Sequence, residues 1–600
     1  MDEPIYITGA GIISAIGSNK CEVLHSLQEK RSGIGKMHYL QSEHTELPVG
    51  EVKLSDGQMR ELLSLAEDKA ANRTSLMGTI AMKEALKEAN IHSEIENIIF
   101  ISGTTVGGMD YTERYFLDLQ HNDDKLQIIA THDCGATTLL QADYFGIPHS
   151  NVMTISTACS SAANAMIVGA NLIKSGKADI VIAGGSEAIT KFHLNGFNSL
   201  LILDHELCRP FDATRVGLNL GEGAAYVVLE SAESVQRRGV TPIGELRGYG
   251  NACDAFHQTA SSSNGEGAYL AMSEALKMAD LNTGEIQYVN AHGTGTLNND
   301  ISESVALRRI FGEKMPLVSS TKSFTGHTTS ASGAIEAVIC LLALQHQFVP
   351  ANLGWAHQMT ESEGITPTLG ESHFRLRHVM CNSFGFGGND SSLILSRYAG
   401  NLQQKHKRNL RPVFLRSVVK HTPETKITNM RDFISPNEGR RMCNLLKAAL
   451  VTSMSVLRDA GITTPEGIFI GTKFGMLSNS EKFLQQMCLE GEHALGPTLF
   501  MQSTHNTIAG MLAIHTKCHG YNITFSQGEQ SLTCSLRDAA LQIALGHIDN
   551  ALVGCHDEST PLFSDMFKRL TGKEFAVGEY SISLVLTSSP EGAIKEFKDF

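Results

Sequence analysis

The chain has 600 residues, of which 42% are hydrophobic and 19% are charged, so disorder over its whole length is excluded. At about 100–200 residues per domain, this length predicts roughly three to six domain-sized units. A formal net charge of −14 argues against binding nucleic acid or an anionic membrane through overall charge, although a local basic patch for a partner stays compatible with it.

The amino-terminal segment, MDEPIYITGAGIISAIG, carries acidic residues where a secretory signal has a basic region. No apolar run approaches the roughly 20 residues of a membrane-spanning helix. We therefore expect a cytoplasmic protein. The twelve cysteines are too sparse for a disulfide scaffold, and no pair has the C-x-x-C spacing of a zinc or redox motif. Most should be reduced thiols in the core, and we expect no metal site.

Short β-branched runs alternate with alanine-rich stretches along the chain, which is typical of an α/β fold. The predicted strands are, in chain order, Ile98–Ile101, Val152–Ile155, Ile180–Ala183 and Ala225–Leu229. Helical spacing of apolar residues predicts helices over Ser161–Ile173 and Gly267–Met278. The polar, basic segment Gly400–Arg416 is interpreted as an interdomain linker, with a docking patch for an acidic partner as the less favoured reading.

An internal repeat organises the second half of the chain. Residues 522–557 align without a gap on residues 152–187, and the segments 467–476 and 577–586 resemble 98–109 and 220–229. The alternative is a chance likeness of two α/β units, but three matches in the same order favour duplication. The last 180 residues or so are therefore predicted to be a second copy of roughly residues 60–230.

Candidate chemistry begins where the strand in VMTISTACSSAANAMIVG runs into a turn of small residues and then a helix. Cys159 lies at the amino end of that helix, where the helix dipole and free N–H groups favour a thiolate and can bind an oxyanion. A lone cysteine before a helix is usually a core residue, so this one needs partners to act as a nucleophile.

Three further motifs supply such partners. NAHGTGT at 290–296 places His292 in a turn after a predicted strand. TKSFTGH at 321–327 places Lys322 and His327 before a helix of small residues, and NSFGFGGND at 382–390 is a glycine loop that lets backbone approach a ligand. Each motif alone is a moderate signal, whereas the ordered set is highly specific.

With RPFD at 209–212 and LGEGAA at 220–225, these motifs resemble the elongating β-ketoacyl-acyl-carrier-protein synthases over residues 1–400. The resemblance implies an α/β thiolase fold with five layers, α-β-α-β-α, followed by an α/β half-thiolase domain. The implied boundaries are 1–250 and 251–400 for the two halves of the synthase, 401–412 for a linker, and 413–600 for a half domain without catalytic residues.

The resemblance also implies roles for the site residues. Cys159 would hold the acyl chain as a thioester, and His292 and His327 would bind the enolate formed when a malonyl thioester loses carbon dioxide. Lys322 would keep the region of His327 polarised and oriented. The N–H groups of Cys159 and Phe386 would form the oxyanion hole, with the Phe386 side chain as a gate.

Further positions carry weaker expectations. The expected substrate-contacting residues are Val106, Phe384, Thr294 and Thr296. Glu303 and Glu336 match structural acidic positions near the site, although ordinary ion-paired helix residues are an equally good reading. Thiolases use a second reactive cysteine near the glycine loop; here Cys381 is interpreted as a core residue. The third catalytic position is His327 rather than the asparagine of priming and chalcone-type synthases, so decarboxylative elongation fits best.

The repeat places Glu529 at the position of Cys159, and it ends before any counterpart of the histidine motifs. We expect no catalysis there, and the copy resembles the chain-length-factor partners of polyketide and polyene synthases. One hypothesis is that residues 413–600 mimic the second subunit of a synthase dimer, with Asn522–Phe525 pairing with Asn151–Ile155 of its own or of another chain. The other is an external docking domain on a homodimer formed by residues 1–400.

Two function classes follow. The first is an active condensing enzyme in fatty acid, polyketide, aryl polyene or flexirubin-like synthesis; the second is a non-catalytic partner that shapes another synthase's product. No cofactor is expected beyond the 4′-phosphopantetheine of an acyl-carrier-protein substrate. Because that carrier is acidic, a basic patch should bind it. Lys69 and Arg73 are candidates, with solvated surface charge as the alternative.

Overall fold

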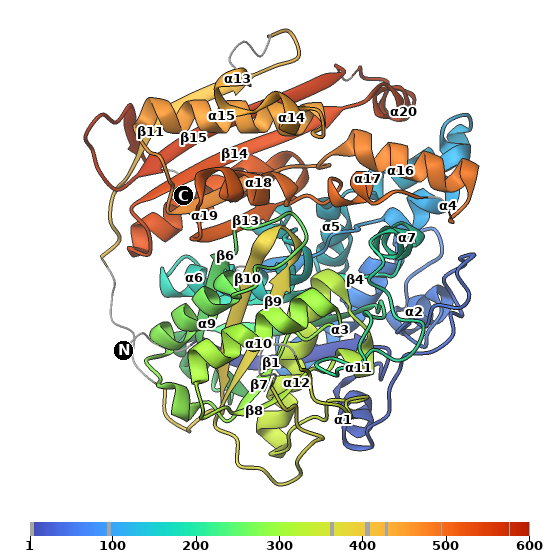
Figure 1. The fold of residues 1–600 in the computed structure, drawn as a ribbon, viewed down its shortest axis with the longest axis vertical. Helices are drawn as coiled ribbons and strands as arrows, with labels where there is room; N and C mark the ends of the chain where they lie inside the picture. The colour runs from blue at the N-terminus through green and yellow to red at the C-terminus, as the bar shows by residue number, and fades with distance from the viewer. Residues whose placement is uncertain are drawn as a thin grey trace.

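The computed structural model describes residues 5–92, 98–360, 365–402, 409–425, 430–493, 495–574 and 576–598. Within these residues the strands form a continuous mixed sheet of sixteen strands, in the order β16-β11-β15-β14-β12-β13-β3-β2-β4-β5-β1-β6-β10-β9-β7-β8. The carboxy-terminal segment, coloured orange to red in Figure 1, lies on top of the amino-terminal 400 residues. No helix among the described residues is long and apolar enough to cross a membrane.

The first half of the amino-terminal 400 residues is a twisted five-stranded unit. Its strands are β1 (Ile5–Ser14), β2 (Ile98–Gly103), β3 (Val152–Ile155), β4 (Ile180–Glu187) and β5 (Gly223–Glu230). Helix α3 (Arg73–Glu88) packs on one face against β1 and β5, and α6 (Ser161–Lys174) packs on the other face against β2 and β4. The four predicted strands and the predicted helix at Ser161–Ile173 are therefore confirmed.

The second half repeats this arrangement. Its strands are β6 (Gly244–Cys253), β7 (Tyr288–Asn290), β8 (Leu317–Ser319), β9 (His378–Gly385) and β10 (Asn389–Ser396). Helix α12 (Ser332–His346) contacts both β5 and β9, so α6 and α12 form a buried layer between two sheet faces. The predicted helix at Gly267–Met278 is α9 (Glu266–Ala279), which covers β6 and β10 from outside with α10 (Leu297–Phe311). The five-layer thiolase fold is confirmed.

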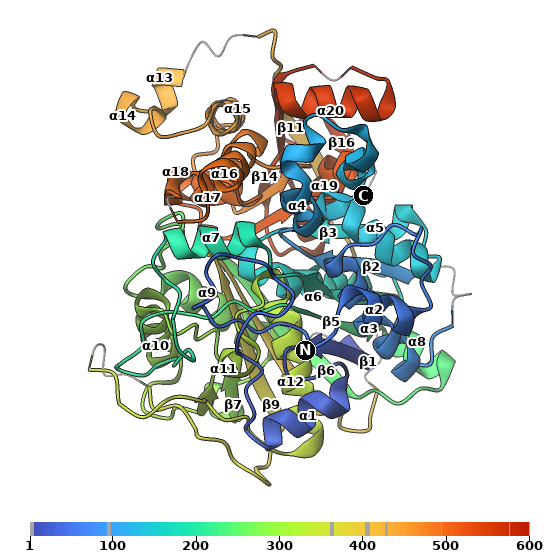
Figure 2. The ribbon, with the colours of Figure 1, turned by 90° about the vertical axis from the view of Figure 1, so that its right-hand side faces the viewer.

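The carboxy-terminal copy has the same strand order in reverse. Its strands are β11 (Val413–His421), β12 (Gly467–Gly471), β13 (Tyr521–Phe525), β14 (Asn550–Ser559), β15 (Gly578–Thr587) and the short β16 (Lys595–Phe597). Helices α15 (Asn444–Ala460) and α19 (Ser531–Leu545) take the places of α3 and α6. Figure 2 shows the copy with the helices of the first half rising beside it.

The two copies meet at β3 and β13, which pair antiparallel within one chain through Ile155 and Phe525. The Ser156 N–H donates to the Thr524 carbonyl and the Ser526 N–H donates to the Thr154 carbonyl, each at 2.9 Å. These are equivalent residues of the repeat, so the contact has a local pseudo-twofold symmetry. The predicted strand pairing is confirmed, and the external docking domain is wrong: the copy occupies the edge of β3.

Two of the predicted boundaries can be placed relative to the strands. Strand β6 runs through the predicted boundary at residue 250, so a strand rather than a loop joins the two halves. The predicted linker at 401–412 falls between β10 and β11, and residues 403–408 lie outside the described residues. Its last part contacts the copy, because Arg411 forms a 2.8 Å ion pair with Asp549.

Candidate active site

The nucleophile turn follows β3. A short 3-10 helix, η3 (Ala158–Ser160), leads into α6, and Ala158 has a left-handed φ of +51°. A left-handed alanine is strained, and such strain persists only where the surroundings hold it in place. In the copy the same position is Gly528, with φ +52°, which adopts this conformation without a Cβ clash. The turn places Cys159 at the buried start of α6, where 5% of the Cys159 surface is exposed.

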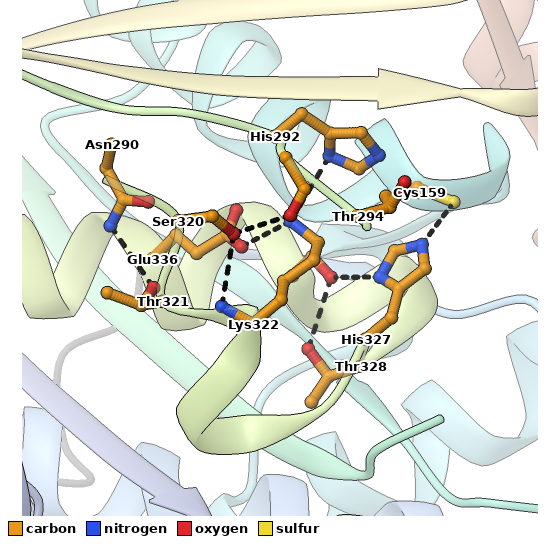
Figure 3. A network of polar contacts seen from close by, with 12 residues as sticks. Cys159, Asn290, His292, Thr294, Ser320, Thr321, Lys322, His327, Thr328 and Glu336 are labelled. Carbon is orange, nitrogen blue, oxygen red and sulfur yellow. Dashed lines mark hydrogen bonds and ion pairs between the residues drawn. The ribbon is translucent and has the colours of Figure 1, made fainter. Parts of the chain in front are cut away.

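His327 is the direct partner of Cys159. Its Nε2 lies 3.1 Å from the Cys159 sulfur, and its Nδ1 lies 3.1 Å from the Ser332 hydroxyl (Figure 3). The ring is buried, and the residue is anchored by its backbone N–H, which donates to the Asn219 carbonyl at 2.7 Å. The ring is therefore held between the thiol and a hydroxyl that can either donate or accept.

His292 forms the second side of the site. Its ring centroid lies 5.3 Å from that of His327, and its Nδ1 lies 3.3 Å from the Lys322 ammonium. Glu336 accepts from the same ammonium at 2.5 Å, while the Glu303 carboxylate accepts from the backbone N–H groups of His292 and Gly293. Because Lys322 can only donate, the His292 proton resides on Nε2, on the side away from Lys322.

The structure places Lys322 differently from the expected contact with the region of His327. Its hydrogen bonds go to His292 and Glu336, and Ser332 takes the corresponding place beside His327. The reason is the short helix α11 (Lys322–Thr325), which directs the lysine inward against α12, where Glu336 lies. The two glutamates predicted to be structural are thus both in contact with the site: Glu336 accepts a hydrogen bond from Lys322, and Glu303 holds the backbone of the His292 turn.

Burial sets the protonation states. It raises the pKa of Cys159 to about 12, although the charge of Lys322 and the Phe386 N–H that binds the sulfur act in the opposite direction. Burial therefore opposes the thiolate that the helix end favours, and the thiol needs a proton acceptor beside it to react. Burial and the Lys322 charge lower the pKa of both His292 and His327 well below the usual value, so both are neutral at pH 7.

The glycine loop after β9 supplies backbone rather than side-chain chemistry. A Cβ at Gly385 would lie 2.9 Å from the Thr157 carbonyl, and Gly387 has a left-handed φ of +82°. This close approach brings the Phe386 N–H to the Cys159 sulfur. The Asn506 amide of the carboxy-terminal copy donates to the Phe386 carbonyl at 2.7 Å, so the copy holds this loop from behind.

A cavity joins these groups and reaches the surface. Besides Cys159, His292, His327 and Phe386, its lining includes three of the predicted substrate-contacting residues, Phe384, Thr294 and Thr296. Its lining also includes three exposed apolar side chains, Leu201, Val216 and Leu297, which are 86%, 55% and 54% exposed. The fourth predicted residue, Val106, is buried and lines a separate cavity at the contact with the copy.

Comparison with known proteins agrees with this geometry. The family described as β-ketoacyl synthase matches with its amino-terminal domain at residues 2–234 and its carboxy-terminal domain at 243–356, and a second amino-terminal-type domain matches at 416–596. The chain is 33% identical over 413 residues to nodulation protein E of Rhizobium meliloti, covering 66% of this chain and all of that one. The chain belongs to the β-ketoacyl synthase family.

Two other similarities describe how far the likeness extends. A 3-oxoacyl-[acyl-carrier-protein] synthase 2 of Synechocystis is 33% identical over 411 residues, covering 66% of this ketosynthase and 98% of that protein. The solved structure named PfaC keto synthase-chain length factor has a TM-score of 0.81 and 16% identity, covering 98% of this chain and 78% of that one. The latter shows that the whole fold, copy included, occurs in a solved structure.

Among the residues of the copy that the structure describes, no cysteine and pair of histidines come together as they do around Cys159. Glu529 is 81% exposed at its side chain and forms a 3.0 Å ion pair with Lys473. The helix start that buries Cys159 is covered by the second half of the synthase, and the copy has no such half. Its sequence equivalent therefore faces outward, as expected for a position without a nucleophile.

One of the two basic docking candidates is wrong. The Arg73 guanidinium is buried and forms ion pairs with Glu222 at 2.6 Å and Asp56 at 2.7 Å, so it anchors α3 instead of facing a carrier. Lys69 is exposed. Cys381 is buried on β9, as interpreted from the sequence.

The sulfur of Cys159 and one ring nitrogen each of His292 and His327 lie within 4.8 Å of one another. Soft ligands at this spacing can hold a transition metal. The Lys322 ammonium 3.3 Å from His292 opposes a second cation there. Sequence reasoning missed Ser332, although it lies in the helix of small residues that follows His327, and it missed Asn506, which lies in no motif.

Proposed function

We propose that this ketosynthase catalyses the decarboxylative condensation of an acyl chain held on Cys159 with a malonyl thioester of acyl carrier protein, giving a 3-oxoacyl thioester. The observation that carries the proposal is the 3.1 Å contact between the Cys159 sulfur and His327, with a second neutral histidine, His292, facing the same cavity. A thiol, a proton acceptor for it and a hydrogen-bond donor for the enolate therefore line the same cavity.

Acyl transfer comes first. His327 Nε2 accepts the Cys159 proton as the sulfur attacks the thioester carbonyl, which lowers the barrier that the raised thiol pKa imposes. The developing oxyanion is bound by the N–H groups of Cys159 and Phe386. The carbon–sulfur bond to the carrier then breaks, and the departing pantetheine sulfur takes the proton back from His327.

Decarboxylation and condensation follow. When the malonyl thioester loses carbon dioxide, its electron pair passes to the carbonyl oxygen as an enolate, and the His292 Nε2–H donates to it. His327 assists in its Nε2–H tautomer, because the Ser332 hydroxyl can donate to Nδ1. The enolate carbon then attacks the acyl carbonyl on Cys159, the carbon–sulfur bond breaks, and the released thiolate takes up one proton from solvent, which balances the negative charge of the malonyl carboxylate. Neutral histidines suit this step because each can donate a hydrogen bond to the enolate oxygen without placing a second positive charge beside Lys322.

The access route fits a carrier-bound substrate. The apolar rim at Leu201, Val216 and Leu297 would receive the carrier and its pantetheine arm, which brings the only prosthetic group the reaction uses. The proposal includes a reaction without a metal and docking of the acidic carrier near exposed Lys69. It also includes a cytoplasmic location, with which the twelve free cysteines are consistent.

The carboxy-terminal copy acts as a built-in partner subunit. Its strand β13 occupies the edge of β3, and Asn506 supports the Phe386 loop, so one chain carries both surfaces of the contact. The products belong to fatty acid, polyketide, aryl polyene or flexirubin-like synthesis. The alternative, a non-catalytic chain-length-factor-like partner of another synthase, is disfavoured by the complete set of Cys159, His292, Lys322 and His327.

The test is acylation followed by condensation. We expect the intact protein, mixed with an acyl carrier-protein thioester, to gain the acyl mass on the Cys159 peptide and then to release a 3-oxoacyl thioester when malonyl carrier protein is added. Cys159→Ala should do neither. A folded wild-type protein that takes up no acyl group from a panel of chain lengths would favour the non-catalytic reading.

A further inference from the structure

The strained turn at Cys159 is held from behind by an asparagine of another strand. Asn389 begins β10, and its side-chain oxygen lies 2.7 Å from the Ser160 hydroxyl and accepts from the Asn164 amide at 2.8 Å. Asn164 also donates to the Thr157 hydroxyl at 2.9 Å, so the two asparagines hold the chain on both sides of the nucleophile. These four partner side chains are at most 1% exposed. A buried polar network of this kind favours one geometry when every group in it has a partner.

The nitrogen end of the Asn389 amide reaches the carboxy-terminal copy. It donates to the backbone carbonyl of Asn522, on β13, at 2.5 Å. A carbonyl can only accept, so it determines that the oxygen end of the amide faces the turn at Cys159. Asn251 makes a second connection, because its nitrogen lies 3.0 Å from the same carbonyl and 2.8 Å from the Asn164 oxygen. Its own oxygen accepts from the Asn522 N–H at 2.8 Å.

The repeat supplies an internal comparison. In the copy the left-handed position of the turn is Gly528, which adopts this conformation without strain. Cys534 stands there in place of Asn164, so the amide that holds the turn is absent where the strain is absent. In the synthase the left-handed residue is Ala158, and its strain persists only where the surroundings hold it. The asparagine network and the strained turn therefore occur together.

We propose that Asn389 is a positioning residue for acyl transfer, which holds the turn of Cys159 against strand β13 of the copy. The inference rests on the proposed condensing activity and adds a contact through which the copy acts on the nucleophile, separate from the contact of Asn506 with the Phe386 loop. The Asn389 side chain contacts the neighbours of Cys159 rather than its sulfur. It acts on the place of the sulfur and of the Cys159 N–H, whereas the histidines that bind the enolate lie on other turns.

The test separates the two half-reactions in the full-length protein. Asn389→Leu keeps the bulk of the side chain and removes its hydrogen bonds. We expect acyl transfer to Cys159, measured as the mass of the acylated peptide in a single turnover, to slow roughly 5- to 150-fold, the range for a buried polar group left without a partner. Carbon dioxide release from malonyl carrier protein should stay within about twofold of wild type, because the histidines bind the enolate. Unchanged acyl transfer, or an equal loss of both reactions in the folded variant, would overturn the inference.

A second substitution asks whether the network acts through the strained turn. Ala158→Gly removes the strain that the network opposes. In that background Asn389→Leu should slow acyl transfer by less than about threefold, because the two positions are coupled. A loss of the same size in both backgrounds would show that Asn389 does not act through the turn.

Asn251→Leu tests the connection to the copy at a half-buried position, where a replacement disturbs the fold less. It should again slow acyl transfer while sparing carbon dioxide release, and unchanged acyl transfer would exclude a part for the copy. Asn171→Leu is the matched control, because it removes another buried asparagine further along α6, whose oxygen accepts from the Tyr249 hydroxyl. A selective loss of acyl transfer in this control too would contradict a specific role for Asn389. A wild-type protein that takes up no acyl group would overturn the proposed function itself.

Discussion

The support that the carboxy-terminal copy gives to the catalytic loop can be tested with one side chain. Asn506→Ala removes the amide that donates to the Phe386 carbonyl at 2.7 Å. A buried carbonyl left without a partner costs about 1–3 kcal/mol. Because about 1.4 kcal/mol is a tenfold change in rate, acyl transfer to Cys159 should slow roughly 5- to 150-fold if the cost falls on the loop geometry. Complete removal of one oxyanion-hole donor, about 10²–10³-fold, sets the upper limit.

The assay separates the two half-reactions. Acyl transfer is followed by the mass of the acylated Cys159 peptide in a single turnover, and decarboxylation by carbon dioxide release from malonyl carrier protein. Only acyl transfer needs the Phe386 N–H, so decarboxylation should stay within about twofold of wild type. Asn479→Ala is the matched control, because its amide donates to a carbonyl of the same copy, Gln502, away from the loop. Unchanged acyl transfer, or an equal loss of both reactions, would refute the reasoning.

Three further predictions concern charge and position. Neither His292 nor His327 should gain a proton as the pH falls from 8 to 5.5, because burial and the Lys322 charge lower the pKa of both rings; a protonation of either ring centred near pH 6.5, followed by NMR of the imidazoles, would contradict this. Arg73→Ala should lower the free energy of unfolding in urea by about 3–5 kcal/mol, because Glu222 stays buried without its cation; a loss below about 1 kcal/mol would show that the pair contributes little. Glu529→Cys in a Cys159→Ala background should gain no acyl group by mass spectrometry, because that position is exposed and has no histidine beside it; acylation there would be the contrary result.

The nucleophile, its partners and the fold could be predicted because each lies in a short motif whose local structure the sequence determines. Small residues after a buried strand specify the turn at Cys159, and glycines specify the loop at Phe386. The repeat was visible for the same reason. The repeat indicated that Asn522–Phe525 and Val152–Ile155 are equivalent strands that can pair with one another, whereas the structure shows that they pair within one chain.

The features that the sequence did not reveal depend on contacts and burial that arise only when the chain folds. Lys322 lies five residues from His327, yet its ammonium reaches His292 because α11 turns it toward Glu336. Arg73 looks like surface charge until Glu222, 149 residues away, is brought beside it. Cys159 has a helix start in its favour, and only the three-dimensional burial shows that desolvation prevails.

The central claim is that one chain carries both the catalytic thiolase fold and the partner surface that completes it. The direct measurement is light scattering of the eluting protein, with each fraction assayed for formation of the 3-oxoacyl thioester. We expect the single chain of 65.0 kDa to have all of the condensing activity, with an activity per chain that does not change on dilution. Activity confined to an assembly of two chains, and lost when that assembly dissociates, would contradict it.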